Sequence, residues 1–379
     1  MDKSNVLDKL VLLKKKSGNH SPSLSEIQMV VGKDPVKIDA CFLSNPYATD
    51  LIYESGIIDE VKDNFFKLVE SYPPNQDYIL DKIRTIEGIS IENSIAMSGA
   101  QACIEVLLSN LKYSNCLLPI PTYSSYHESL RDGAHVHYLG LKEANNFRIN
   151  EAELHESILR NNIDLLVLIN PNNPTGVGVD QKIFGNLLNK FKDLQIIIDE
   201  SFSHFFDDLH EWKTFRKALL NNERCYLVKS MSKDFGIAGC RIGFMESSNP
   251  IMQDIKSRYG TWALSNLAVM ILEVMSTDVF LKNYEEARIK YLFEKKSFYN
   301  QLIKIQNIKV YESDSNFFLI KLLNSVDSGF KFVMELLLKT GLYVRSMDDK
   351  DGLDSSYIRV ACRSKDENRE IIKILKANV

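Results

Sequence analysis

Short apolar runs alternate with amphipathic segments through the middle of the chain. The runs occupy residues 93–98, 115–120, 134–140, 163–170, 194–201, 225–230 and 240–245. Between them, residues 99–112, 122–132 and 181–193 repeat apolar positions with helical spacing. Strands that are buried on both faces read as continuous apolar runs. The pattern therefore predicts a three-layer α/β/α domain around a mostly parallel sheet.

The pattern changes after about residue 276, where long helical segments surround two apolar runs, "NFFLIK" and "SYIRVAC". A chain of 379 residues exceeds the usual size of a single hydrophobic core. We therefore predict a large domain over residues 56–275. Residues 1–55 and 276–379 are expected to form a smaller α+β domain.

Composition narrows the class of protein. The chain is 45% hydrophobic and 25% charged, and its formal net charge is -4. These values fit a globular protein and give no reason to expect nucleic acid or an anionic membrane as a partner. Its six cysteines form no C-x-x-C pair, which favours a reducing compartment. No apolar stretch is long enough to span a membrane, and the N-terminal segment reads as an amphipathic helix. The expected location is therefore cytoplasmic.

Polar residues follow several of the predicted strands. In parallel α/β sheets, ligands bind at the carboxyl ends of the strands. The residues found there are Ser98 and Gly99, Tyr123, Asn173, Asp199, and Ser230 with Ser232 and Lys233. Their convergence on one edge of the sheet predicts a single site.

The stretch "SMSKDFGIAGCRIGF", residues 230–244, combines a lysine with phosphate-binding groups. Partial burial or a neighbouring cation lowers the pKa of a lysine and makes its amine nucleophilic. The hydroxyls of Ser230 and Ser232 and the guanidinium of Arg241 suit a phosphate. Pyridoxal phosphate has both an aldehyde and a phosphate, so it would use Lys233 and these groups together. The alternative is a lysine in a surface turn.

Other strand ends fit the same cofactor. A carboxylate at Asp199 needs a cation, and a protonated pyridine nitrogen is one. In "NPNNPTG", Asn173 presents an amide that can donate to a ring oxygen. Gly99, Ala100 and Gln101 begin a helix, whose free N–H groups favour phosphate. Tyr123 can stack on a flat ring, although core packing is the alternative for it.

Two arginines in the C-terminal part suit an anionic substrate. Arg359 lies within the predicted strand "YIRVAC", where a charge needs a partner, and Arg345 lies in "LYVRS". A guanidinium binds carboxylate or phosphate with two parallel hydrogen bonds. Arg345 can also be read as a surface residue.

Together these motifs resemble the fold-type-I pyridoxal-phosphate enzymes of aminotransferase class I/II over nearly the whole chain. The resemblance is greatest to histidinol-phosphate aminotransferase and threonine-phosphate decarboxylase. It implies that Lys233 forms a Schiff base with the cofactor and that Asp199 binds the ring nitrogen. It also implies that Arg359 holds a substrate carboxylate, and that Asn45 and Tyr47 of "SNPYATD" lie near the substrate. Tyr72 of "SYPPN" resembles a tyrosine that reaches the other subunit's cofactor, which implies a homodimer with shared sites.

Two residues, Phe202 and His20, bear on whether the protein catalyses transamination or decarboxylation. Many aminotransferases carry a tyrosine three residues after the aspartate, whereas this chain has Phe202, which is commoner on the decarboxylase side of the family. His20 resembles a histidine of the decarboxylase branch that binds substrate phosphate, but it can equally be a solvated side chain. The prediction is an aminotransferase that acts on a small phosphorylated substrate with a donor such as glutamate. The alternatives are a decarboxylase of an O-phospho-amino acid and, more remotely, an inactive binding protein.

Other classes of site lack their motifs. A zinc enzyme would need H-E-x-x-H or paired cysteines, and "HES" at residue 127 has no second histidine at the required spacing. A dinucleotide site would need G-x-G-x-x-G, and "TGVGVD" lacks its third glycine. No metal is therefore expected.

Overall fold

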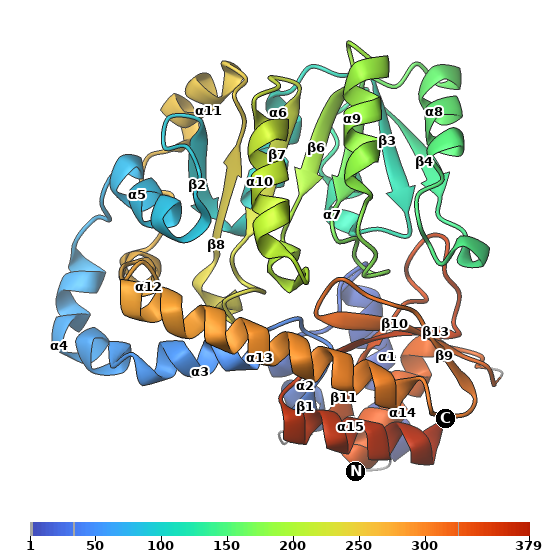
Figure 1. Ribbon diagram of the computed structural model, residues 1–379. Coiled ribbons are helices and arrows are strands. Elements are labelled where there is room, and N and C mark those ends of the chain that lie inside the picture. Colours follow the sequence, from blue (N-terminus) through green and yellow to red (C-terminus); the bar gives the residue numbers. More distant parts are fainter. Residues whose placement is uncertain (1–2, 33–34, 325) are drawn as a thin grey trace.

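The computed structural model describes residues 3–32, 35–324 and 326–379, and a seven-stranded sheet forms its centre (Figure 1). The strand order is β2-β8-β7-β6-β5-β3-β4. The strands are β2 (Ser94–Ser98), β3 (Asn115–Ile120), β4 (His135–Gly140), β5 (Leu165–Ile169), β6 (Gln195–Asp199), β7 (Cys225–Ser230) and β8 (Ile242–Glu246). Only β8 runs antiparallel to its neighbours β2 and β7. The prediction of a mostly parallel sheet is confirmed.

Helices cover both faces of this sheet because the strands are apolar on both sides. In β5, Leu165 and Val167 join the core formed with α6 (Gly99–Asn110). The alternating residues Leu166 and Leu168 join a second core, formed with α8 (Glu151–Arg160), α9 (Gln181–Lys190) and α10 (Leu209–Leu220). Side chains alternate between the faces of a strand, so one continuous apolar run supplies both cores. The three-layer architecture follows.

Helices α5 (Gln76–Glu87), α11 (Ile251–Tyr259) and α12 (Asn266–Met275) flank the β2 edge of the sheet. The helix predicted over residues 122–132 is shorter than expected, because α7 (Ser124–Glu128) ends after five residues. Beyond it, the backbone N–H of Arg131 donates to the Tyr113 hydroxyl at 3.0 Å. This contact with a distant segment replaces the helical hydrogen bonds.

A smaller, four-stranded antiparallel sheet has the order β12-β13-β10-β9. Its strands are β9 (Ile308–Val310), β10 (Phe317–Leu322), β12 (Arg345–Ser346) and β13 (Tyr357–Ala361). Helices α14 (Gly329–Thr340) and α15 (Lys365–Asn378) belong to this part, and the long helix α13 (Asp278–Leu302) runs between the two sheets (Figure 1).

The N-terminal segment packs on this C-terminal part. Strand β1 (Ile38–Asp39) pairs in parallel with β11 (Leu342–Tyr343). Helices α1 (Lys3–Lys16) and α2 (Leu24–Val31) share the core of α14 and α15. Helices α3 (Pro46–Glu54) and α4 (Ile57–Glu70) then lead to the large sheet. We retain residues 56 and 275 as the proposed domain boundaries.

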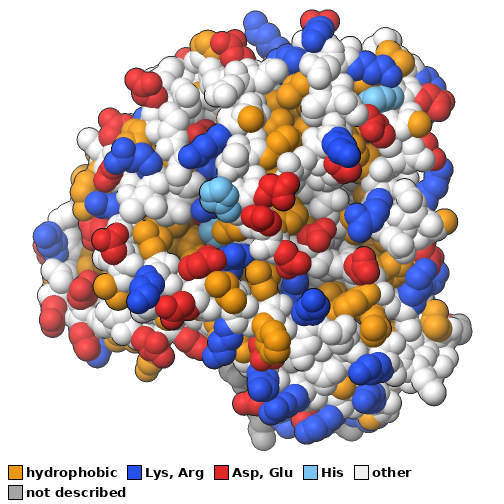
Figure 2. Space-filling model, viewed as in Figure 1, with side chains coloured by type: hydrophobic (Ala, Val, Ile, Leu, Met, Phe, Trp, Pro, Cys, Tyr) orange, Lys and Arg blue, Asp and Glu red, His pale blue; other side chains and the backbone are white. Residues whose placement is uncertain are grey.

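The surface is mixed in charge on the face that Figure 2 shows, where acidic and basic side chains are interspersed. No large field of one sign covers this face, in keeping with a net charge of -4. Among the helices that the structure describes, none is both long enough and apolar enough to span a membrane.

Candidate active site

The carboxyl ends of the strands surround a cavity of about 140 Å³. The structure brings nine of the predicted cofactor residues to its wall: Ala100, Gln101, Tyr123, Asn173, Asp199, Phe202, Ser230, Lys233 and Arg241. Eight of them come from the carboxyl ends of five strands, β2, β3, β5, β6 and β7, because parallel strands place these ends at one edge of the sheet, and Arg241 directly precedes β8. The convergence that the sequence predicts is present.

Lys233 follows β7 and lines this cavity. Its Nζ lies 3.5 Å from the hydroxyl of Ser230. Burial lowers the pKa of Lys233, and Arg241 adds to the effect, while the carboxylate of Asp199 opposes it. The amine is therefore easier to deprotonate than a surface lysine, as a nucleophile requires.

Asp199 ends β6 and is 4% exposed. Its carboxylate accepts hydrogen bonds from the Ser201 N–H at 2.9 Å and from the Tyr126 hydroxyl at 3.0 Å. Burial raises its pKa, although both hydrogen bonds and Lys233 oppose the shift. A buried carboxylate in this position is stabilised by a cation in the cavity, and a protonated pyridine nitrogen fits that need.

The start of α6 and Arg241 form a narrow cradle at one end of the cavity. Gly99 has φ of 81°, and a Cβ there would lie 2.6 Å from Nη2 of Arg241. A Cβ on Gly243 would lie 2.6 Å from the Ala100 nitrogen. Only glycines allow the guanidinium and the helix N-terminus to approach so closely. The donors of this cradle suit a phosphate group.

A second cavity of about 200 Å³ adjoins the first and shares Tyr123, Asn173, Phe202 and Lys233 with it. Its remaining lining comes mainly from the N-terminal segment and the small sheet. These residues include His20, Cys41, Arg345, Lys350 and Arg359. The position of Lys233 at the junction makes the second cavity the natural place for a substrate.

Arg359 lies at the junction of the two cavities. It donates to Oδ1 of Asn173 at 2.6 Å and to the Cys41 carbonyl at 2.9 Å, and its guanidinium lies over the Phe317 ring. Its Nε is buried without a hydrogen-bond partner. Within the described ranges no carboxylate lies within 4.0 Å of this guanidinium. Burial lowers the pKa of Arg359 to about 10, so the site favours an anion.

Arg345 is the direct cross-strand partner of Arg359 in the β12–β13 pair. Like charges in directly opposite positions destabilise a sheet. One counterion is present, since Asp349 accepts from Arg345 at 2.6 Å and from Lys14 at 2.6 Å. The interpretation of Arg345 as a surface residue is wrong, because the residue is 5% exposed and lines the second cavity.

His20 lines the mouth of the second cavity but remains exposed. Its Nε2 lies 3.7 Å from a carboxylate oxygen of Glu128, and its ring contacts Tyr123 edge-on at 6.2 Å. The side chain is therefore close enough to meet a ligand, while it also forms an ordinary surface ion pair. Its role in phosphate binding stays a prediction.

Three predicted residues lie elsewhere. Asn45 is fully buried, caps α3 and donates to the Asp234 carbonyl at 3.1 Å. It thus supports the backbone beside Lys233 and is not among the residues that line either cavity. The Tyr47 hydroxyl accepts from the Lys365 N–H at 3.3 Å. Tyr72 is 74% exposed and stacks on Trp262, with ring centroids 4.2 Å apart.

Ser232 lines neither cavity, whereas Phe202 forms part of the wall of both. The Ser232 hydroxyl is buried without a hydrogen-bond partner, while its backbone N–H donates to the Ser230 hydroxyl at 3.3 Å. Phe202 is 3% exposed and packs edge-on against Phe317 at 5.4 Å. Because phenylalanine has no hydroxyl, this position offers no hydrogen bond to a cofactor.

Sequence reasoning missed Tyr126 and Lys350. Tyr126 follows Tyr123 by three residues in "PTYSSY", and its hydroxyl donates to Asp199. Lys350 stands in "SMDDKDG", a polar turn without a recognised motif. The one feature of the sequence that pointed to Lys350 was its position between Arg345 and Arg359.

A buried ionic network supports the backbone next to Lys233. The Lys229 ammonium lies 2.8 Å from the Asp234 carboxylate and 3.8 Å from that of Glu87. His204 joins Glu87 at 3.1 Å and the Tyr284 hydroxyl at 2.8 Å. Although Glu87, His204 and Asp234 could converge on a metal, the Lys229 ammonium already supplies the positive charge. A structural role follows.

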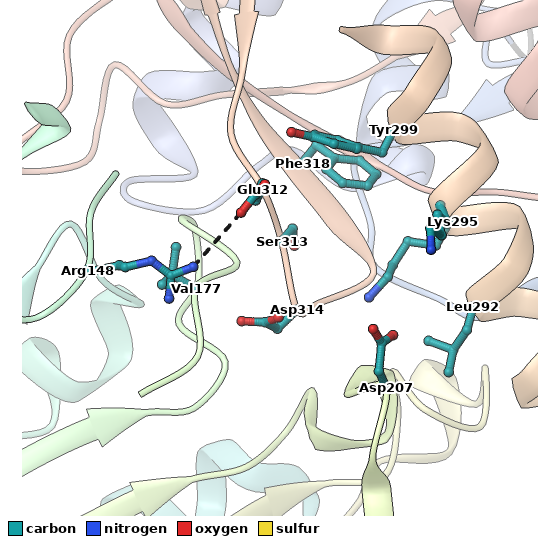
Figure 3. Close-up of a pocket in the computed structure, with 11 residues that line it drawn as sticks. Arg148, Val177, Asp207, Leu292, Lys295, Tyr299, Glu312, Ser313, Asp314 and Phe318 are labelled. Atoms are coloured by element: carbon teal, nitrogen blue, oxygen red, sulfur yellow. Dashed lines mark ion pairs between the residues drawn. The ribbon is translucent and has the colours of Figure 1, made fainter. Parts of the chain in front are cut away.

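A third cavity, of about 250 Å³, lies away from these residues (Figure 3). It is lined by Leu292, Lys295 and Tyr299 of α13 and by Phe318 of β10. Phe318 and Phe317 point to opposite faces of β10, so the strand separates this cavity from the site. In Figure 3, Lys295 points toward Asp207, and its amine donates to the Phe205 carbonyl at 3.0 Å. None of the predicted site residues lines it.

Comparison with known proteins gives one family. The model of aminotransferase class I and II matches residues 76–375. The L-serine phosphate decarboxylase of Campylobacter jejuni is 34% identical over 97% of this chain and 95% of its own length. The histidinol-phosphate aminotransferase of Methanococcus aeolicus is 28% identical over 88% of this chain and 87% of its own.

A solved structure agrees with the sequence comparison. A decarboxylase from Sulfurospirillum multivorans superposes with a TM-score of 0.89 at 33% identity, covering 99% of this chain and 96% of that one. The family resemblance predicted from the motifs is thereby confirmed. The chain belongs to the aminotransferase class I and II family of pyridoxal-phosphate enzymes with fold type I.

Proposed function

We propose that this protein is a pyridoxal-phosphate-dependent decarboxylase of O-phospho-L-serine. The observation that carries the proposal is the cationic second cavity, which adjoins Lys233 and is large enough for a small anionic substrate. When bound, pyridoxal phosphate supplies an aldehyde that attaches an amine and a ring that accepts the electron pair released at Cα. The rest of the reaction depends on side chains of this chain.

The charges around the second cavity match this substrate. The cavity is lined by three cations, Arg345, Lys350 and Arg359. A fourth cation, Lys14, shares the carboxylate of Asp349 with Arg345. This group thus has four positive charges and one negative charge. Three positive charges therefore remain. A phosphate monoester carries about -1.5 to -2 at pH 7, and a carboxylate adds one more negative charge. O-Phospho-L-serine would balance the site, whereas unmodified serine would leave it strongly positive.

Substrate orientation decides which bond at Cα breaks, because the bond perpendicular to the cofactor ring is the one that is weakened. Arg345 and Lys350 both donate to the Asn19 carbonyl, whereas Arg359 donates to Asn173. An anion bound between Arg345 and Lys350 fixes the side-chain end of the substrate. Binding of the phosphate then determines how the bonds at Cα lie relative to the cofactor ring. In this orientation the bond to the carboxylate can stand perpendicular to that ring.

Lys233 is placed to complete the reaction. Loss of carbon dioxide leaves Cα short of one proton, and the Lys233 amine at the junction can deliver it. The balanced reaction consumes O-phospho-L-serine and one proton, and it yields O-phosphoethanolamine and carbon dioxide. Buried Phe202 adds no hydroxyl to this wall of the site.

The relatives support the decarboxylase alternative better than the transamination that the sequence slightly favoured. The Campylobacter protein named as an L-serine phosphate decarboxylase is 34% identical, while the named aminotransferase is 28% identical. Transamination of a phosphorylated substrate remains the second candidate, because the same cations would bind it.

We expect O-phospho-L-serine alone to yield a phosphorylated amine and carbon dioxide over many turnovers. Addition of 2-oxoglutarate should leave the rate unchanged, since decarboxylation needs no amino acceptor. Product identification by mass spectrometry, with and without 2-oxoglutarate, checks this expectation. Turnover that requires an acceptor, or that occurs with histidinol phosphate and 2-oxoglutarate but not with O-phospho-L-serine, would overturn the proposal.

We also propose that the active form is a homodimer, as the resemblance of Tyr72 implies. Exposed apolar side chains lie along α4 and beside it: Phe65, Phe66, Val69, Tyr72 and Trp262. Phe66 is 77% exposed, and a contiguous apolar patch of this kind is typical of an interface.

Light scattering should give twice the chain mass of 43.4 kDa. Substitution Phe66→Lys should shift the protein toward monomer and lower activity, because a buried charge would oppose association. The matched control is Phe293→Lys, at an equally apolar position of α13 that is 73% exposed. A fully active monomer would refute the shared site and, with it, the role of Tyr72.

A further inference from the structure

Lys350 is a cation of the second cavity that, like Arg359, has no carboxylate partner among the described residues. Arg345 is engaged by Asp349 at 2.6 Å. Lys350 follows Asp349 in the chain, yet within the part of the chain that the structure describes no carboxylate lies within 4.0 Å of its amine. Its two hydrogen-bond partners are the Asn19 carbonyl at 3.2 Å and the Ser124 hydroxyl. Both are neutral oxygen atoms, so its charge remains available.

The surroundings of Lys350 are unfavourable for an ammonium without an anion. Burial lowers the pKa of Lys350 to about 8, and Arg345, Arg359 and Lys14 add to the effect while Asp349 opposes it. A bound dianion would relieve both the desolvation and the repulsion from neighbouring cations. Binding of a dianion in the second cavity would therefore stabilise the Lys350 ammonium and its neighbouring cations.

The hydrogen-bond partners of Lys350 and Arg359 indicate one place for a carboxylate and another for a phosphate. Arg359 bonds Asn173 next to the cofactor cavity, where a carboxylate attached to Cα would lie. Lys350 and Arg345, the cross-strand neighbour of Arg359, instead share the Asn19 carbonyl as a hydrogen-bond acceptor. The Ser124 hydroxyl beside Lys350 can donate to a phosphate oxygen as well.

We propose that Lys350 is the specificity-determining residue that selects a phosphorylated side chain, binding the phosphate dianion together with Arg345 and the Ser124 hydroxyl. The inference rests on the proposed function for the identity of the substrate. Recognition of the phosphate by Lys350 does not, however, depend on which bond of the substrate breaks.

The experiment compares holoenzyme with the variants Lys350→Gln and Lys350→Arg, and with Lys373→Gln as a control at an exposed position of α15. The probe is 3-phosphoglycerate, which carries the phosphate and carboxylate of O-phospho-L-serine but has no amine to react. Glycerate is the matched probe without phosphate. Calorimetry measures both dissociation constants, and kcat/KM for O-phospho-L-serine is measured in parallel.

We expect Lys350→Gln to weaken 3-phosphoglycerate binding by roughly 10- to 150-fold, the range of a charge-assisted hydrogen bond. Glycerate binding should change little, Lys350→Arg should restore part of the affinity, and Lys373→Gln should resemble the native protein. An equal loss for both probes would show that Lys350 only anchors the Asn19 loop, and it would overturn the inference. Unchanged 3-phosphoglycerate binding would overturn it too.

The two proposals fail separately. If the native protein binds 3-phosphoglycerate in a Lys350-dependent way but releases no carbon dioxide from O-phospho-L-serine, the phosphate site stands and the proposed reaction falls. If carbon dioxide forms and Lys350→Gln keeps the native preference for phosphate, the reaction stands and the inference about Lys350 falls.

Discussion

Substitution Lys233→Ala should abolish decarboxylation and leave the protein folded. We expect turnover to fall by at least about 10³-fold, because the residue supplies both the amine that attaches the cofactor and the proton for Cα. Stability should not suffer, since burial disfavours the charged amine and lowers its pKa. Activity on O-phospho-L-serine and intact mass after borohydride reduction are the two measurements.

The native protein should gain the mass of one reduced cofactor per chain, and Lys233→Ala should gain none. The exposed lysine variant Lys192→Ala serves as a control and should behave as the native protein. A Lys233→Ala protein that retained native turnover, or that still carried the cofactor covalently, would show that another amine does this chemistry.

Substitution Asp199→Asn should have the next largest effect. Breaking a buried ion pair by removal of one partner costs about 3–5 kcal/mol, and each 1.36 kcal/mol is about tenfold in rate. We therefore expect kcat to fall by about 10²- to 10⁴-fold. The physical reason is that a neutral amide cannot hold a proton on the ring nitrogen, so the ring accepts the electron pair less well.

Unfolding of the cofactor-free protein gives a second readout for Asp199. Burial raises its folded-state pKa above the unfolded value, so the ionised carboxylate lowers stability at pH values above its unfolded pKa. Cofactor-free Asp199→Asn should accordingly be at least as stable as the native protein at neutral pH. Tyr126→Phe, which removes one hydrogen bond to the carboxylate, should reduce kcat far less. A loss below tenfold in Asp199→Asn would argue against an electron-sink role.

The sequence was most informative where function depends on local pattern. Strands such as β5 and β6 are continuous apolar runs, and the residues that end them must meet at one edge of a parallel sheet. For that reason Lys233, Asp199 and Asn173 could be assigned to one site without a structure. The same rule brought Tyr123 and the start of α6 to the cavity.

The remaining features depend on contacts between distant segments. Asn45 was expected near the substrate, but its amide bonds the Asp234 carbonyl across 189 residues of sequence. Lys350 has no motif, and its importance appears only once β12 and the Asn19 loop are placed together. The length of α7 depends on a hydrogen bond to Tyr113. Periodicity carries no information about such pairings.

The central claim is that the bond between Cα and the carboxylate breaks. The most direct measurement follows the carbon of that carboxylate in O-phospho-L-serine labelled with ¹³C at C1, with holoenzyme and no keto acid. We predict that the label appears as carbon dioxide and bicarbonate, in amounts equal to the O-phosphoethanolamine formed, through many turnovers. Label that stays in a phosphorylated keto acid, with the reaction stopping after one turnover per site, would contradict the account and establish transamination.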